Sequence, residues 1–443
     1  MWNPHLVGIA YREGVLVSEL QPMAFDDLLD RHFLKPQYQP IFDLTSGEMV
    51  GTEALARWPG LGISPEPAFA WGSREGRLDE LDEACRNAAI DDAIAHGLPW
   101  RFALFVNLEP SVLGPRTASR LLARTAGHVD LVVEITERAL LHRPAELLAA
   151  CHQLRSAGCA IALDDVGALP DSLALLPFLA PDVIKLDVAL VQVWPNVGQA
   201  TIYTTVAAYA ERTGATVLAE GIETAAHLDQ ALALGATLGQ GFYFQRPGPL
   251  GAMAPPGQSL SRRQPVSAAP VSPFSLVDPS MVRIAPKKMI EGLSKHLEYQ
   301  ALRLETPPVV LGAFEEALHF TPLSAARFAH LATLCPMVAT FGVGLPAEPA
   351  SRVRGVSLGS DDPLRREWIV AVVGAHYAGA LIAQDLGDSG PERLRRFAFV
   401  LTHDYDTVLA AARSLLARVT YASGYPGLAP VASHWATRQV DAA

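Results

Sequence analysis

The sequence predicts an α/β protein in which a (β/α)8 TIM-like barrel precedes a smaller α/β domain. Three observations predict it. Strand-like segments alternate with helical segments across residues 1–251. Residues 252–275 are rich in Pro, Ser and Ala and have no apolar period, which is typical of a linker. Strand-like and amphipathic segments then alternate again over residues 276–443.

The expected barrel strands are short apolar segments bounded by polar or turn residues. In chain order they cover residues 38–44, 49–58, 102–108, 131–136, 160–166, 182–187, 216–222 and 239–244. Helical period is clear between several of them, for example over residues 78–97 and 145–158. An open, doubly wound sheet is the alternative, but eight strand–helix units favour a closed barrel.

The C-terminal domain contains the most apolar run of the chain, from Trp368 to Ala383. The run is short for a membrane span and includes a histidine and two glycines, so we expect no membrane span. We expect a buried strand followed by a helix there instead. The N-terminus has no basic segment followed by a long apolar run, so it does not read as a signal peptide.

Composition restricts the partners and the compartment. The formal net charge is −11, which argues against non-specific binding to duplex nucleic acid, because that binding needs basic surfaces. A small anionic ligand held by local cations remains compatible with this charge. The four cysteines include no CxxC pair, so we expect reduced core thiols in a cytoplasmic protein.

Polar residues stand at or near the carboxyl ends of seven expected strands. They are Glu53, Asn107, Glu134 with Glu137, Asp164 with Asp165, Lys185 with Asp187, Glu220 and Gln240. One such residue is most often a helix cap. Helix capping alone does not readily explain why seven strands end in a polar residue, most often an acid. In (β/α)8 barrels the carboxyl ends of the strands carry the chemistry.

Asp164 and Asp165 are adjacent at the end of an apolar strand. Neighbouring strand residues point to opposite faces, so both can reach one target only where the pleat breaks. Converging carboxylates repel each other unless neutralised. Lys185 supplies one positive charge, and divalent cations would supply the rest. Oxygen ligands without His or Cys indicate Mg²⁺ or Mn²⁺, and paired acidic sites for two metal ions are typical of phosphodiester hydrolysis. A helix cap beside a solvated acid is the alternative for an isolated pair.

The N-terminal domain resembles the EAL domain, the cyclic-di-GMP phosphodiesterase family of bacterial signalling. The resemblance runs from about Phe33 to Pro247 and rests on an ordered set of motifs. They are "YQPIFDL", "GTEALARW", "FVNLEP", "VVEITE", "LDDVG", "PDVIKLD", "LAEGIET" and "GATLGQGFYFQRP". The signature triplet itself is Glu53-Ala54-Leu55.

The resemblance implies roles for individual residues. As ligands of two divalent ions, Mg²⁺ or Mn²⁺, it implies Glu53, Asn107, Glu134, Asp164 and Asp165. As catalytic residues it implies Lys185, Glu220 and Asp165. As substrate-binding residues it implies Gln39, Arg57, Asp187 and Gln240, and Glu137 would anchor the loop after Asp165. The implied reaction is hydrolysis of one ester bond of cyclic-di-GMP to give linear pGpG, in a protein that forms a homodimer.

The loop after Asp165 departs from the family pattern. The family reads close to "DDFGTGYSSL" there, whereas this chain reads "DDVGALPDSL". Leu169 and Pro170 stiffen a backbone that is glycine-rich in the family. We therefore expect weak metal retention and low basal activity. A catalytically weak or inactive cyclic-di-GMP receptor that signals through partner or dimer contacts is the alternative function.

The C-terminal domain resembles the DICT domain, a sensory module found beside cyclic-di-GMP enzymes. The similarity rests on the apolar pattern together with "RRFAFVLT" and "THDYD". It implies a sensory or dimerisation role for residues 276–443, and the sequence does not name the sensed ligand.

Overall fold

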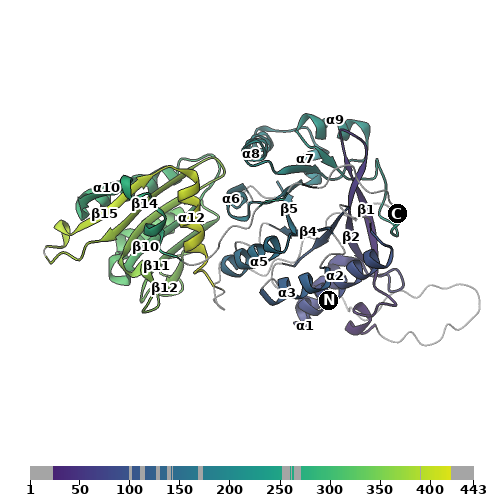
Figure 1. Ribbon diagram of the computed structural model, residues 1–443, viewed down its shortest axis with the longest axis horizontal. Helices are drawn as coiled ribbons and strands as arrows, with labels where there is room; N and C mark the ends of the chain where they lie inside the picture. Colours follow the sequence, from purple (N-terminus) through teal and green to yellow (C-terminus); the bar gives the residue numbers. More distant parts are fainter. Residues whose placement is uncertain are drawn as a thin grey trace, which may run out of the picture.

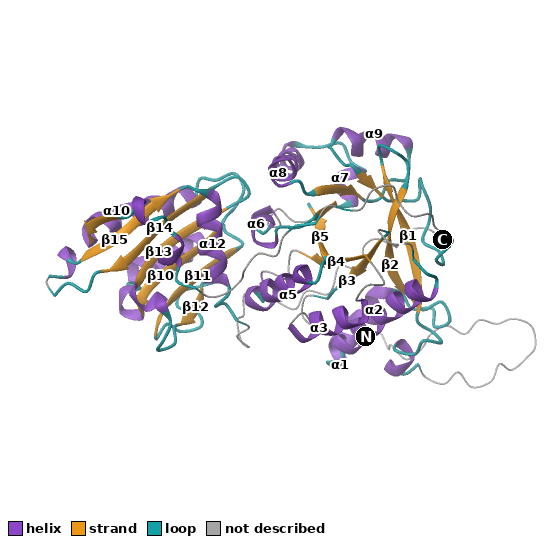
Figure 2. Ribbon diagram, in the orientation of Figure 1, coloured by secondary structure: helices purple, strands orange, loops and turns teal. Residues whose placement is uncertain are grey.

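The computed structural model divides into two α/β units, shown in Figure 1 and coloured by secondary structure in Figure 2. It describes residues 23–98, 102–109, 115–125, 130–136, 141, 143–167, 173–251, 260, 262–263, 271–389 and 391–420. Much of the expected linker therefore lies outside the described residues, as do Glu137 and residues 168–172 of the altered loop. Within the described residues, no helix is both long enough and apolar enough to cross a bilayer.

The first unit contains eight strands and the helices between them. The strands are β1 (Lys35–Asp43), β2 (Met49–Arg57), β3 (Ala103–Asn107), β4 (Asp130–Thr136), β5 (Ala160–Val166), β6 (Val183–Leu186), β7 (Thr216–Ala219) and β8 (Leu238–Gly239). The helices are η1 (Phe25–Leu28), α1 (Pro65–Glu75), α2 (Leu78–Ala95), α3 (Pro115–Thr125), α5 (Pro144–Ser156), α6 (Leu176–Leu179), α7 (Val188–Val191), α8 (Val197–Thr213) and α9 (Ala225–Ala233).

These strands close into a barrel in the order β1 to β8, which confirms the predicted fold class. One feature differs from a regular (β/α)8 barrel. Strand β1 is antiparallel to both of its neighbours, because a short turn joins it directly to β2 without a crossover helix. The strands from β2 to β8 are parallel, so their carboxyl ends meet at one rim.

The last barrel strand is shorter than the sequence predicts. We expected a strand over residues 239–244, but β8 ends at Gly239 and residues 241–244 form a turn. The turn begins at Gly241, where an added Cβ would lie 2.1 Å from the Ile222 carbonyl oxygen. Only glycine allows the backbone to come this close, and the ladder stops there.

The second unit contains one mixed sheet of seven strands in the order β12-β11-β10-β13-β14-β15-β9. The strands are β9 (Arg283–Pro286), β10 (Val309–Glu316), β11 (Met337–Val343), β12 (Arg354–Ser357), β13 (Glu367–Val373), β14 (Ala378–Asp385) and β15 (Arg396–Thr402). The helices are α10 (Lys287–Ala301), α11 (Pro322–Leu331) and α12 (Tyr405–Leu416), with short 3-10 turns η4 (Pro273–Leu276), η5 (Pro279–Met281), η6 (Ala317–His319), η7 (Pro363–Arg366) and η8 (Glu392–Leu394). Helices α10 and α11 pack on one face, and α12 packs on the other.

The apolar run from Trp368 to Ala383 forms two strands, so the expected helix was wrong. Strands β13 and β14 pair as an antiparallel hairpin, with Trp368 opposite Ala383. The sheet is covered on both faces, so the run is apolar at nearly every position and shows neither strand nor helix periodicity. Its glycines gave no clear sign of where the hairpin turns.

Candidate active site

The barrel interior explains why the rim of the barrel is polar. Side chains on a strand alternate between the two faces, so residues two apart share a face. Apolar residues fill the interior, and on the strands from β3 to β8 the next inward-facing position is polar. The pairs are Phe105 and Asn107, Val132 and Glu134, Ala162 and Asp164, Val183 and Lys185, Leu218 and Glu220, and Leu238 and Gln240. One layer of polar side chains therefore lies above the apolar core.

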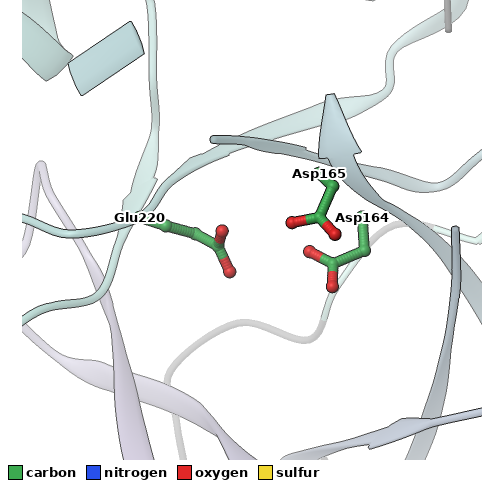
Figure 3. Close-up of side chains that lie close together, drawn as sticks. All are labelled: Asp164, Asp165 and Glu220. Carbon is green, nitrogen blue, oxygen red and sulfur yellow. The ribbon is translucent and has the colours of Figure 1, made fainter. Parts of the chain in front are cut away.

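Asp164 and Asp165 lie where the β5 pleat breaks. The pairing of β5 with β6 is irregular between Leu163 and Val166, and Asp165 has a φ of 60° in the left-handed region. This conformation is uncommon for a residue with a Cβ and costs about 1–3 kcal/mol, so it persists where the site requires it. Both carboxylates approach Glu220, and one oxygen from each residue lies within 4.8 Å of the others (Figure 3).

Lys185 occupies the centre of the layer. Its side chain is 0% exposed, and its Nζ lies 2.5 Å from Glu134 Oε1, 3.0 Å from Glu220 Oε1 and 3.1 Å from Asp164 Oδ1. Glu53 Oε2 is 3.6 Å away. A buried ammonium is tolerated only when charged partners surround it, and here four strands supply them.

Amide side chains fix the orientation of Glu53. Asn107 Nδ2 donates to Glu53 Oε1 at 3.3 Å, and Gln240 Nε2 donates to Glu53 Oε2 at 2.5 Å. Gln240 Nε2 also lies 3.3 Å from Gln39 Oε1, and Gln39 stands opposite Glu53 in the β1–β2 register. These contacts bring Gln39, Glu53, Asn107 and Gln240 together on one side of Lys185.

The site carries more negative than positive charge. Glu53, Glu134, Asp164 and Glu220 surround the ammonium of Lys185, and Asp165 adds a fifth carboxylate beside Asp164 and Glu220. Burial raises the pKa of Glu134 well above its usual value, and the charges of Glu53 and Asp164 add to this, while Lys185 opposes it. Glu134 Oε2 is buried and has no hydrogen-bond partner within the described part of the chain. An oxygen-only donor set with an unused buried carboxylate oxygen fits a divalent cation such as Mg²⁺ or Mn²⁺.

Two predicted substrate-binding residues lie at the edge of this layer. Arg57 ends β2, on the same face as Glu53, where burial lowers its pKa and the Glu53 charge opposes that shift. Its Nη1 donates to the Ala56 carbonyl at 2.8 Å. Asp187 caps α7 by accepting from the Ala189 amide at 2.8 Å, so one of its oxygens already has a structural partner.

Sequence reasoning missed the residues that align β7 with β8. The Ile222 amide donates to the Gln240 carbonyl, and the Gln240 amide donates to the Ala219 carbonyl. Because Gly241 has no Cβ, its backbone can lie against Ile222. The resulting backbone hydrogen bonds hold Glu220 and Gln240 at the same height in the barrel. The two glycines that flank Gln240 in "LGQGF" were the sequence signal for a close backbone contact at this point.

Comparisons with known proteins identify both units. A sequence profile described as "EAL domain" matches residues 23–247. A second, described as "Sensory domain in DIguanylate Cyclases and Two-component system" and abbreviated DICT, matches residues 272–386.

Curated relatives align with about half of the chain. The chain is 32% identical to "Cyclic di-GMP phosphodiesterase RocR" of Pseudomonas aeruginosa over 233 residues, which are 50% of this chain and 59% of RocR. It is 32% identical to "Probable cyclic di-GMP phosphodiesterase PdeG" of Escherichia coli over 223 residues, which are 48% of this chain and 44% of PdeG. The chain thus spans less than two thirds of the length of these relatives.

A solved structure aligns with about half of the chain. BlrP1 of Klebsiella pneumoniae, in complex with calcium and cyclic-di-GMP, is 30% identical and covers 49% of this chain and 56% of its own, with a TM-score of 0.43.

Proposed function

Because this chain belongs to the EAL domain family, we propose that it hydrolyses cyclic-di-GMP to linear pGpG with two divalent metal ions. The observation that carries the proposal is the group of carboxylates around Lys185, beside the paired acids Asp164 and Asp165. The names of RocR and PdeG support the substrate and the reaction.

The donor set supports the metal requirement. Glu53, Asn107, Glu134 and Asp164 would hold one ion, and Asp164 with Asp165 would hold the second. When bound, the two ions would supply positive charge to the attacking and leaving oxygens of the phosphodiester. Mg²⁺ and Mn²⁺ are the expected ions because every donor is an oxygen.

The protein groups have separate tasks in this proposal. Lys185 Nζ is held among carboxylates from four strands and directs its charge toward a phosphate oxygen or the attacking water. Glu220 Oε1, 3.0 Å from that ammonium, accepts the proton of the water as the water oxygen bonds to phosphorus. One phosphorus–oxygen ester bond breaks, the leaving oxygen takes up a proton from solvent water, and Glu220 afterwards releases to solvent the proton that it accepted.

Recognition of the dinucleotide is assigned to the rim. The Arg57 guanidinium would donate to a phosphate, since its planar fork matches two phosphate oxygens. Gln39, Gln240 and Asp187 would orient the substrate. Residues 1–251 would form the phosphodiesterase unit and residues 276–443 the sensory unit, joined by a linker over residues 252–275. Homodimer formation and a ligand for the DICT domain stay predictions.

An inactive receptor is the second candidate, and the altered loop sequence favours it. The test incubates the purified full chain with cyclic-di-GMP and Mg²⁺ or Mn²⁺, and follows pGpG by chromatography beside a sample with EDTA. Metal-dependent pGpG formation supports the enzyme. Binding of cyclic-di-GMP by calorimetry without pGpG at saturating metal would identify a receptor instead.

A further inference from the structure

The DICT domain contacts the barrel at a helix that lies, in the sequence, between two strands of the candidate active site. Helix α12 lies on the side of the DICT sheet that faces α5 and α6 (Figure 1). Arg413 of α12 donates from Nη2 to the carbonyls of Pro177 at 2.7 Å and Phe178 at 3.1 Å. These two carbonyls belong to α6, which lies between the loop after Asp165 and strand β6.

Two arginines donate hydrogen bonds to the backbone carbonyls at the carboxyl end of α6. Arg155 of α5 donates from Nη2 to the carbonyls of Leu179 at 2.9 Å and Ala180 at 2.6 Å. A helix end leaves four carbonyls without partners inside the helix, and here Arg155 and Arg413 bind four consecutive ones. Because α6 has only one turn and ends at Ala180 with a φ of 47°, it depends on such outside partners.

In the sequence, α6 lies between the paired acids Asp164 and Asp165 and the central Lys185. At its amino end the chain leads back to Asp164 and Asp165, and at its carboxyl end Lys185 follows Ala180 by five residues. Asp182 lies between them and fixes the start of β6, because its Oδ2 accepts from the Ile161 amide of β5 at 2.8 Å. Arg155 Nη2 also lies 3.6 Å from Asp182 Oδ2, so the guanidinium that binds α6 also approaches this residue.

The contact between Arg413 and α6 is sensitive to the position of α12. Arg413 is 7% exposed, and no carboxylate in the described part of the chain pairs with its guanidinium. Burial lowers its pKa to about 10, so it stays charged at neutral pH. A buried charge that loses its acceptors is strongly disfavoured. A shift of α12 must therefore carry α6 with it or break the contact altogether.

We propose that Arg413 is a positioning residue through which the DICT domain of the same chain controls metal retention at Asp164 and Asp165. The inference rests on the proposed function, because the site that it regulates is the proposed metal site. It differs from control through a dimer partner, since every contact on the path lies within one chain. The DICT domain would act by holding α6, and a ligand of that domain would act by moving α12.

The experiment compares Mn²⁺ binding by the full chain with that of Arg413→Ala, Arg413→Lys and the control Thr205→Val. Thr205 Oγ1 lies 3.0 Å from His376 Nε2 at the same domain interface, but on α8 rather than α6. Calorimetry gives the Mn²⁺ affinity, and hydrogen exchange followed by mass spectrometry reports on residues 173–180. Neither readout needs turnover, so an inactive parent chain would refute the proposed reaction without deciding this inference.

We expect Arg413→Ala to weaken Mn²⁺ binding about tenfold, within the range of outer-shell and coupling effects. Exchange over residues 173–180 should become faster. Arg413→Lys should recover part of both effects, because an ammonium cannot reproduce the fork, and Thr205→Val should match the parent chain. Mn²⁺ affinity within twofold of the parent in Arg413→Ala, or an equal loss in Thr205→Val, would overturn the inference. If Arg413→Ala does not fold, the same two measurements are made on Arg413→Lys. Mn²⁺ affinity and exchange rates equal to those of the parent chain would then overturn the inference.

Discussion

Replacing Lys185 by methionine tests the electrostatic account of the site. The substitution keeps most of the side-chain volume and removes the ammonium that approaches four carboxylates, with Nζ to oxygen distances of 2.5 to 3.6 Å. A pair of unit charges 4 Å apart is worth about 4 kcal/mol at an effective dielectric constant of 20, and desolvation offsets much of that. Breaking a buried ion pair costs a net of about 3–5 kcal/mol, so we expect this loss in the free energy of unfolding without metal.

The loss should depend on pH in a defined direction. The pKa of Glu134 is raised in the folded protein, so its contribution to stability is full below its unfolded value of about 4.5 and is lost as pH rises through the folded value. The Lys185 charge lowers that pKa, so Lys185→Met raises it further. The metal-free variant should therefore lose more stability than the parent between about pH 5 and pH 8.

The assay is urea unfolding in EDTA over this pH range, repeated with saturating Mn²⁺. Added Mn²⁺ should return part of the lost stability, because it replaces the missing positive charge. Lys295→Met, a change at an exposed lysine of α10, is the matched control and should leave the unfolding free energy unchanged. A metal-free Lys185→Met protein as stable as the parent at pH 8 would refute the reasoning.

Three further predictions concern the rim and the loop. Arg57→Ala should weaken cyclic-di-GMP binding by about 1–3 kcal/mol, the value of a lost charged hydrogen bond. Calorimetry with Ca²⁺, which we expect to support little turnover, measures this affinity, and an unchanged value would exclude Arg57 from the site. Asp165→Gly should stabilise the metal-free fold by about 1 kcal/mol, because glycine accepts a φ of 60°, yet weaken Mn²⁺ binding; a variant that is less stable in urea would contradict the assigned strain. Replacing residues 166–172 by "FGTGYSS" should raise initial rates at limiting Mg²⁺ more than at saturating Mg²⁺, and identical metal dependence in parent and graft would show that the altered loop is neutral.

The sequence predicts the barrel and its polar layer because both follow from local patterns. Asp164, Lys185 and Glu220 each continue an inward-facing apolar series, so strand period and strand direction were enough to place them together. The adjacent carboxylates also pointed to a break in the pleat. The pleat breaks because Asp165 adopts a left-handed conformation with a φ of 60°. This backbone angle could not be predicted from the sequence.

Other features depend on contacts that no local pattern records. The turn at Gly241 comes from the approach of Ile222, and the β13–β14 hairpin lies within a run that is apolar at nearly every position. The contact of Arg413 with Phe178 joins residues more than two hundred positions apart. A buried arginine in an amphipathic helix has the same sequence signature as an exposed one, so this contact could not be predicted.

The most direct test of the two-metal site is a crystal structure of the full chain grown with Mn²⁺ and cyclic-di-GMP, with anomalous scattering recorded for manganese. The account predicts two peaks at the rim of the barrel. One should lie among Glu53, Asn107, Glu134 and Asp164, and the second beside Asp164 and Asp165, with a substrate phosphate in contact with both. Absence of both peaks at saturating Mn²⁺, or manganese bound by other residues, would contradict the account.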